Sequence, residues 1–209
     1  MRRYLTRMVR PFTDWRRYCA LLAVIFLVRG IFYLSVLPPF EGWDEYQHLA
    51  YVAFVAQNGR SPVLRESMVP RSLYPALVKY PHATKFAQNQ TEHIGTRSYK
   101  DFWVSDTVPT VSPSARDIDL YQAQHASLYY RLVAPIYRWL WKADDPLIAI
   151  NALRLINVLL GAGSIFIVGL VLGRILVDGP GRYILALLIT LQPLFLVNCA
   201  RIASDALAV

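Results

Sequence analysis

The densest group of side chains that could do chemistry lies in residues 41–48, which read EGWDEYQH. If this stretch is helical, Asp44 and His48 share one face, and Glu45 and His48 form a Glu-x-x-His pattern. A carboxylate held in this way can take a proton from a substrate or bind a metal ion. The structural alternative is that acidic residues near a helix N-terminus are stabilised by the helix dipole. Spacing alone leaves both interpretations open.

A second polar group surrounds His125, which has three tyrosines within five residues of it. A histidine among aromatic residues is more often packed or hydrogen-bonded than a ligand. His82, His93 and His125 have no zinc-ligand spacing with a cysteine. There is no phosphate-binding glycine loop, nucleophile elbow or His-Glu-x-x-His motif. The sequence therefore indicates no cofactor and leaves dependence on a divalent metal open.

Three apolar stretches determine how these groups are held. The chain is 55% apolar and only 17% charged, against about 25% charged residues in a typical soluble domain. Residues 18–37 contain one charge, and residues 155–173 and 183–200 contain none. About 20 apolar residues in a helix cross the hydrocarbon core of a membrane. We therefore expect an all-α integral membrane protein with three transmembrane helices and a long external loop that contains short amphipathic helices.

The expected organisation follows these stretches along the chain. We expect a basic cytoplasmic N-terminus at 1–17, transmembrane helix 1 at 18–37, an external loop with juxtamembrane helices at 38–146, transmembrane helix 2 at 147–176, a cytoplasmic turn at 177–182, transmembrane helix 3 at 183–204, and the start of a second external loop at 205–209.

The orientation follows from the basic residues. Residues 1–17 hold six arginines and one aspartate, whereas residues 38–146 hold 11 basic and 11 acidic residues. Positive charge near membrane ends stays cytoplasmic. We therefore expect a multi-pass protein of the plasma (inner) membrane with a cytoplasmic N-terminus. Because topology accounts for most of the net charge of +8, we expect no nucleic-acid partner.

The external loop should hold two helices that position the polar groups. Residues 43–57 have apolar side chains at helical spacing, and Asn58-Gly59 ends the run. A second helix is expected to begin near Asp119 and to carry His125. Between them, prolines break the pattern over residues 60–113, which favours short helical turns over a β-domain.

Charged residues near the spans raise a further expectation. Arg29 lies near the middle of the first span, where a charge needs a protein or water partner. Arg154 and Arg201 lie nearer the outer interface and are expected to snorkel. Asp205 should emerge on the same side as Asp44. Because three helices supply few partners for Arg29, we expect an N-terminal fragment of a longer membrane protein that is inactive by itself.

Seven short segments, taken in order along the chain, form a recognisable pattern. They are 38–48 (PPFEGWDEYQH), 50–52 (AYV), 58–62 (NGRSP), 124–130 (QHASLYY), 154–161 (RLINVLLG), 193–195 (PLF) and 203–208 (ASDALA). Together these segments resemble the GT-C superfamily of membrane glycosyltransferases, closest to bacterial enzymes like the protein O-mannosyltransferases and the aminoarabinose transferase of lipid A. Ala126 and Ser127 stand where that family has two prolines.

The resemblance implies the N-terminal part of a GT-C-like fold and a transferase that uses a polyprenyl-phosphate-sugar donor. The acceptor, a lipid, glycan or protein, would be glycosylated at the outer face of the membrane. Asp44, with its neighbour Glu45, and Asp205 match the family's catalytic acidic positions, with Asp44 as general base. His125 falls where the family binds the donor phosphate, and His48 and Arg201 are candidates for supporting positions.

Two other functions remain open from the sequence. A non-catalytic multi-span protein, either a transporter fragment or a partner subunit, would leave Asp44 and Asp205 apart or in the lipid headgroups. A metal-dependent hydrolase would use Asp44 and His48 to hold a divalent ion.

Overall fold

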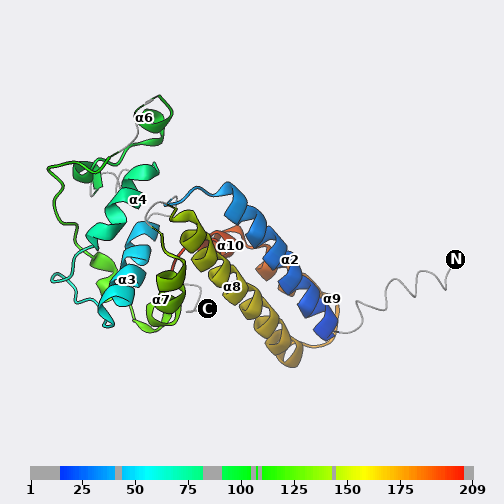
Figure 1. Cartoon of the computed structure of the whole chain (residues 1–209). Helices are drawn as coiled ribbons and strands as arrows, with labels where there is room; N and C mark the ends of the chain where they lie inside the picture. Colours follow the sequence, from blue (N-terminus) through cyan, green and yellow to red (C-terminus); the bar gives the residue numbers. More distant parts are fainter. Residues whose placement is uncertain are drawn as a thin grey trace. The chain divides into compact units, whose positions relative to one another are not determined.

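The computed structural model describes residues 15–40, 44–81, 91–104, 107, 110–142 and 145–204 (Figure 1). Within these ranges the chain is helical and has no strand, only an isolated antiparallel bridge between Met68 and Asp119. The all-α prediction is therefore confirmed. The elements are α2 (Trp15–Val36), α3 (Glu45–Asn58), η1 (Arg71–Leu73), α4 (Tyr74–Lys79), η2 (Glu92–Ile94), α6 (Tyr99–Val104), η3 (Tyr121–Gln124), α7 (Leu128–Leu140), α8 (Leu147–Ile175), α9 (Pro180–Leu191) and α10 (Pro193–Cys199).

The chain forms two compact units. The first, here called the membrane unit, comprises the described residues up to Leu34 together with 155–200. The second, here called the loop unit, comprises residues 35–154 and 201–204. Because α2 and α8 each belong in part to both units, the loop unit contains the last residues of α2 and the first turns of α8.

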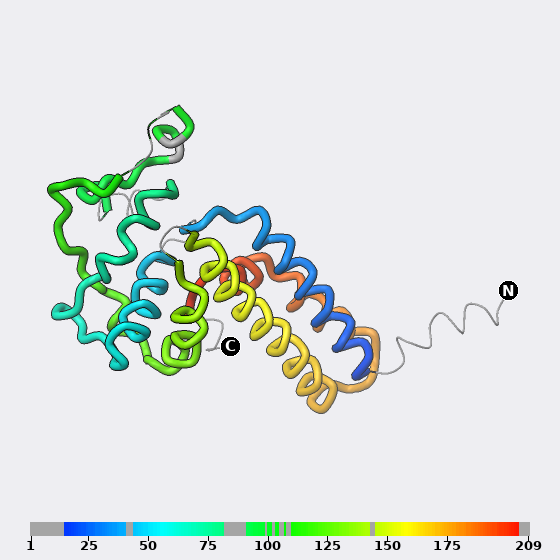
Figure 2. The backbone as a smooth tube through the Cα atoms, in the orientation of Figure 1, coloured from blue at the N-terminus to red at the C-terminus, as the bar shows by residue number. Residues whose placement is uncertain are grey.

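In the described ranges, α2 and α8 are long and apolar enough to cross a membrane. The third predicted span is not a straight helix over 183–204. It is broken at Gln192 into α9 and α10, which are bent by 48° and can form one interrupted span or a re-entrant loop. The bend lies where the trace passes from orange to red in Figure 2. Pro193 explains the break, because it lacks the N–H that would continue the helix.

The break provides Arg29 with a hydrogen-bond partner. Arg29 Nη1 donates to the carbonyl of Thr190, in the last turn of α9, at 2.9 Å. Carbonyls in the last turn of a helix have no partner within it, and a cation is favourable at that end of the helix dipole. The Arg29 side chain therefore has a hydrogen-bond partner within the described helices of the membrane unit.

Glycines let the helices of the membrane unit pack closely. A Cβ on Gly161 would lie 2.7 Å from Cys199 Sγ and 2.8 Å from Phe26 Cε1, and both neighbours are fully buried. A Cβ on Gly163, two residues further along α8, would meet nothing within 4 Å. The two glycines therefore form a matched pair of crowded and open positions.

We expect Gly161→Ala to destabilise the membrane unit by about 1–3 kcal/mol, because the added methyl group overpacks a filled contact. Gly163→Ala should leave stability unchanged or raise it slightly, since alanine is the better helix former. Unfolding in mixed detergent micelles, followed by circular dichroism, measures both. Equal stability of the two variants would contradict the packing of α8 against Phe26 and Cys199.

In the loop unit, α3 is the central helix, and α7 packs along it (Figure 1). Every residue of α3 from Glu45 to Ala56 is buried. The prediction that α3 is amphipathic is therefore wrong, because its polar first turn makes hydrogen bonds inside the unit instead of facing water. The second predicted helix also differs. It is divided into η3 and α7 by His125, whose backbone is extended with φ −78° and ψ 152°.

Candidate functional site

Asp44 stands at the N-cap position of α3. Its carbonyl oxygen accepts hydrogen bonds from the amides of Gln47 and His48, while its side chain makes no capping hydrogen bond. The carboxylate accepts instead from Gln122 Nε2 at 2.6 Å and lies 3.5 Å from His48 Nε2. Its side chain is 30% exposed. The carboxylate is therefore oriented on one side and reachable from the other.

The surroundings of Asp44 favour its ionised form. Burial acts to raise the pKa of Asp44, but the hydrogen bond and charge of His48, together with the charge of Arg201, outweigh it and leave the pKa below the usual value. The neighbouring phenols stay neutral at physiological pH. Burial raises the pKa of Tyr46 to about 12 and raises that of Tyr121 as well.

His48 links Asp44 to α7. His48 is buried, with its side chain 4% exposed. Its Nδ1 lies 2.7 Å from the hydroxyl of Tyr130, while Nε2 faces Asp44. The Tyr130 ring stacks on Tyr51 at a centroid distance of 3.7 Å and an interplanar angle of 6°. Packing and hydrogen bonds thus hold the imidazole in one orientation, with one nitrogen available to the carboxylate.

His125, the position that the resemblance associates with the donor phosphate, lies beside this pair, and it is not on a helix as the sequence analysis expected. Its ring centroid is 5.6 Å from that of His48, and its Nδ1 is 3.3 Å from the Ser204 hydroxyl. The Tyr51 hydroxyl donates to the carbonyl of His125 at 3.2 Å and helps to hold the extended backbone there. The structure therefore brings Asp44, His48 and His125 together. Asp205, the remaining acidic position, lies outside the described residues.

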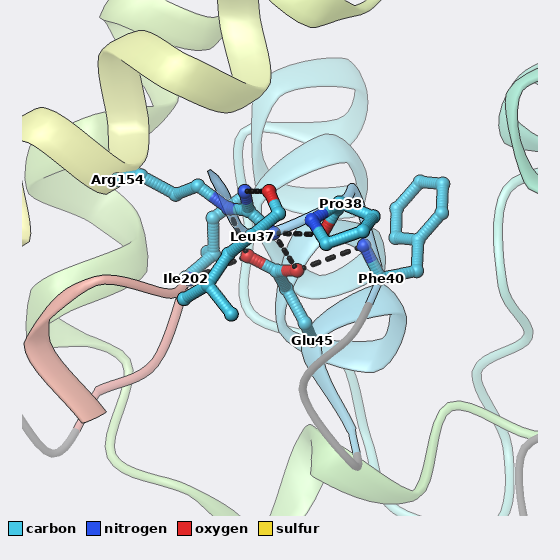
Figure 3. A network of polar contacts seen from close by, with 6 residues as sticks. All are labelled: Leu37, Pro38, Phe40, Glu45, Arg154 and Ile202. Carbon is cyan, nitrogen blue, oxygen red and sulfur yellow. Dashed lines mark hydrogen bonds and ion pairs between the residues drawn. The ribbon is translucent and has the colours of Figure 1, made fainter. Parts of the chain in front are cut away.

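Glu45 occupies a different environment from Asp44. Its carboxylate is fully buried and accepts four hydrogen bonds, from Phe40 N, Ile202 N and two nitrogens of Arg154, at 2.6–2.9 Å. Arg154 also donates to the carbonyls of Leu37 and Pro38. Figure 3 shows Arg154 reaching from α8 and Glu45 from the start of α3, with the other residues around them. All of these residues belong to the loop unit.

This network shows that the expectation for Arg154 was wrong. Arg154 does not snorkel to an interface; its side chain is 1% exposed and pairs with Glu45 through two hydrogen bonds. Arginine suits this position because its planar fork matches a carboxylate and still has donors for the carbonyls. Arg201, the other arginine expected to snorkel, is half-buried and acts electrostatically on Asp44.

The sequence did not assign roles to Gln122, Tyr130 or Ser204, although each lies in a segment that it singled out. Gln122 and Tyr130 flank His125, and Ser204 precedes Asp205. Their polar side chains gave no spacing signal, because their partners are 78 or more residues away along the chain. The position of Arg154 did carry a signal in the sequence. A charged residue at the end of an apolar helix needs a counter-ion, so pairing with an acidic residue such as Glu45 could have been predicted.

The described part of the chain contains no group of three His, Cys, Asp or Glu side chains that could hold a metal ion. Asp44 and His48 are two such groups, with His48 Nε2 at 3.5 Å from the Asp44 carboxylate and His48 Nδ1 within hydrogen-bond distance of Tyr130.

No family model matches the chain, and neither the curated proteins nor the solved structures contain a match to it. The functional argument therefore rests on the geometry around Asp44 and on the sequence segments that form it.

Proposed function

We propose that this protein is a membrane glycosyltransferase that moves a sugar from a polyprenyl-phosphate-sugar donor to an acceptor hydroxyl, with Asp44 as the base. The observation that carries the proposal is the state of the Asp44 carboxylate. It is partly exposed, oriented by Gln122 and His48, and held in its ionised form. An oriented, reachable carboxylate is what deprotonation of a bound hydroxyl requires.

In the proposed reaction, the acceptor oxygen bonds to the anomeric carbon of the sugar while its proton passes to Asp44. The bond between that carbon and the phosphate oxygen breaks, and polyprenyl phosphate leaves with the electron pair. His125 lies close enough to the Asp44–His48 pair to share a substrate with it, and its imidazolium form can stabilise the charge that develops on the phosphate. Atoms and charge balance without a metal or a further reactant.

The low pKa of Asp44 defines how it acts. A carboxylate of low pKa is a weak base towards a free alcohol. It is effective when the hydroxyl loses its proton late, after the bond to the anomeric carbon has begun to form and the oxygen has become acidic. Before that point, Asp44 orients the hydroxyl by accepting its hydrogen bond.

Under this proposal Glu45 positions Asp44 and takes no part in proton transfer. Its four accepted hydrogen bonds leave it fully buried and fully engaged. Because Glu45 is next to Asp44 in the chain, the network fixes the start of α3. It also holds the segment at Ile202, close to Ser204 and its contact with His125.

The test is the release of polyprenyl phosphate. The protein, expressed from its full reading frame and purified in lipid nanodiscs, would be incubated with a panel of polyprenyl-phosphate hexoses and pentoses plus a membrane extract as the acceptor source. Loss of the donor with transfer of its sugar supports the proposal. Absence of transfer across the panel, with the protein intact, favours a transporter piece or a partner subunit instead.

The same assay gives a pH prediction. Since the pKa of Asp44 lies below its usual 3.8, the acid limb that reports Asp44 should fall below that pH, and transfer should not fall on account of Asp44 between pH 7 and 5. In His48→Gln the acid limb should move to higher pH. Burial raises the pKa of Asp44, and this variant removes the hydrogen bond and charge of His48 that lower it. An acid limb that stays in place would contradict this role of His48.

The lowered pKa of Asp44 also makes the stability of the folded protein depend on pH. A carboxyl group whose pKa is lowered by folding stabilises the folded state above its unfolded pKa. That contribution is lost as the pH falls through the folded pKa of Asp44.

A further inference from the structure

Both histidines of the candidate site have a hydroxyl group next to Nδ1. His48 Nδ1 lies 2.7 Å from the Tyr130 hydroxyl, and His125 Nδ1 lies 3.3 Å from the Ser204 hydroxyl. A neutral imidazole carries one hydrogen, and the hydrogen bond made at one ring nitrogen decides whether the other nitrogen carries it. The two hydroxyls therefore act on which nitrogen of each ring is protonated.

The partners of His48 decide its tautomer. An ionised carboxylate only accepts hydrogen bonds, so His48 Nε2, which faces Asp44 at 3.5 Å, carries the hydrogen. Nδ1 of neutral His48 is then an acceptor, and the Tyr130 hydroxyl donates to it. In this ring, a hydroxyl at Nδ1 goes together with a hydrogen on Nε2.

Ser204 is held in position to act on His125 in the same way. Its segment is fixed two residues earlier, where Ile202 N donates to the buried Glu45 carboxylate at 2.9 Å. On the other side of the contact, the Tyr51 hydroxyl donates to the carbonyl of His125 at 3.2 Å. Glu45 and Tyr51 both belong to α3. The hydroxyl and the ring are therefore each tied to the central helix of the loop unit.

Nε2 of His125 is the ring nitrogen that remains for a ligand. The part of the chain that the structure describes gives it no hydrogen-bond partner, and the residue is half-buried. When Nδ1 accepts from Ser204, Nε2 carries a hydrogen in the neutral ring and in the protonated ring alike. The nitrogen offered to a ligand is then always a donor, which suits an anion such as a phosphate group.

We propose that Ser204 is a positioning residue that fixes His125 as the Nε2–H tautomer, so that Nε2 donates to a phosphate oxygen of the polyprenyl-phosphate-sugar donor. The contact with phosphate rests on the proposed function, whereas the tautomer does not. Ser204 acts through His125 and does not touch the substrate. Without its hydroxyl the neutral ring can carry its hydrogen on either nitrogen, and in the Nδ1–H form the lone pair of Nε2 repels the phosphate.

Nitrogen NMR of ring-labelled histidine reads the tautomer directly, because protonated and unprotonated ring nitrogens resonate far apart. The protein, expressed from its full reading frame, would be studied in lipid nanodiscs at about pH 9, where free imidazole is neutral. The variants His48→Gln and His125→Gln assign the signals. His93 is an internal reference, because its Nε2 lies 3.1 Å from the carbonyl of Arg116, which only accepts, and so carries a hydrogen.

In the wild-type protein we expect His125 to show a protonated Nε2 and an unprotonated Nδ1, as His93 does. In Ser204→Ala the His125 signals should move to the averaged position of a ring that exchanges between tautomers, while those of His48 and His93 stay in place. Ser204→Thr keeps the hydroxyl and should restore the wild-type spectrum. An averaged or Nδ1-protonated His125 in the wild type overturns the assignment, and so does an unchanged spectrum in Ser204→Ala.

Polyprenyl phosphate, added to the same nanodiscs, tests the contact with phosphate. It should shift the Nε2 signal of His125 but not that of His93, and it should bind about 3- to 10-fold more weakly to Ser204→Ala, the loss typical of one hydrogen bond. No shift at His125 overturns the contact. Because neither spectrum requires turnover, a protein that gives both expected results but transfers no sugar contradicts the proposed transferase and not the role of Ser204.

Discussion

Replacing Arg154 with methionine is expected to destabilise the protein by about 3–5 kcal/mol, the largest effect on stability that we predict. The substitution keeps an apolar stem of similar length but leaves the Glu45 carboxylate buried with no counter-ion. It also removes the donors to the carbonyls of Leu37 and Pro38. Reversible unfolding in mixed micelles, monitored by circular dichroism, measures the loss.

Two further variants separate the ion pair from general damage. In Glu45→Gln with Arg154→Met the buried charge is gone, so the double variant should be less unstable than the sum of the two single ones, with a coupling of about 1–3 kcal/mol. Arg71→Met removes an ion pair with Asp117 whose partners are 67% and 52% exposed, and should change little. Additive effects of the two buried substitutions would contradict the network in Figure 3.

The sequence predicted the helical elements well where the signal was local. The apolar stretches predicted α2 and α8, and the Asn-Gly stop predicted the end of α3, where Gly59 adopts a left-handed φ of 67°. It failed where a tertiary contact decided the outcome. α3 is buried on all sides by contacts with η3, α7 and, at Glu45, Arg154 and Ile202, and periodicity along one helix does not show what covers its polar face.

The candidate site was likewise predictable from local spacing but not where distant segments meet. Asp44 and His48 could be paired from their spacing because both lie on one helical turn. The different environments of Asp44 and Glu45 could not be predicted from spacing. Adjacent residues on a helix point in different directions and meet partners from distant segments. Asp44 meets Gln122, whereas Glu45 meets Arg154, which is 109 residues away. The sequence therefore indicated both carboxylates as reactive, and the structure distinguishes them.

Replacing Asp44 with asparagine is expected to lower the rate of sugar transfer by about 10²–10⁴-fold, the range typical of a lost general base. Asparagine keeps the size of the side chain and an oxygen that can accept from Gln122 Nε2, which now bonds to Asp44 Oδ2. The fold should therefore persist while the group that takes the proton is removed. The effect should appear in kcat, with KM for the donor little changed, because the proton moves only as the new bond forms.

The matched control is Asp117→Asn, which makes the same chemical change at an exposed carboxylate that pairs with Arg71. This variant should transfer sugar at the wild-type rate. Transfer at the wild-type rate by Asp44→Asn would exclude Asp44 as the base and move the proton acceptor to another group, with His48 and Asp205 the first to test. A rise in KM with unchanged kcat would instead make Asp44 a binding residue for the acceptor. Because burial, His48 and Gln122 act on Asp44 and not on Asp117, the difference between the two variants isolates what that environment contributes.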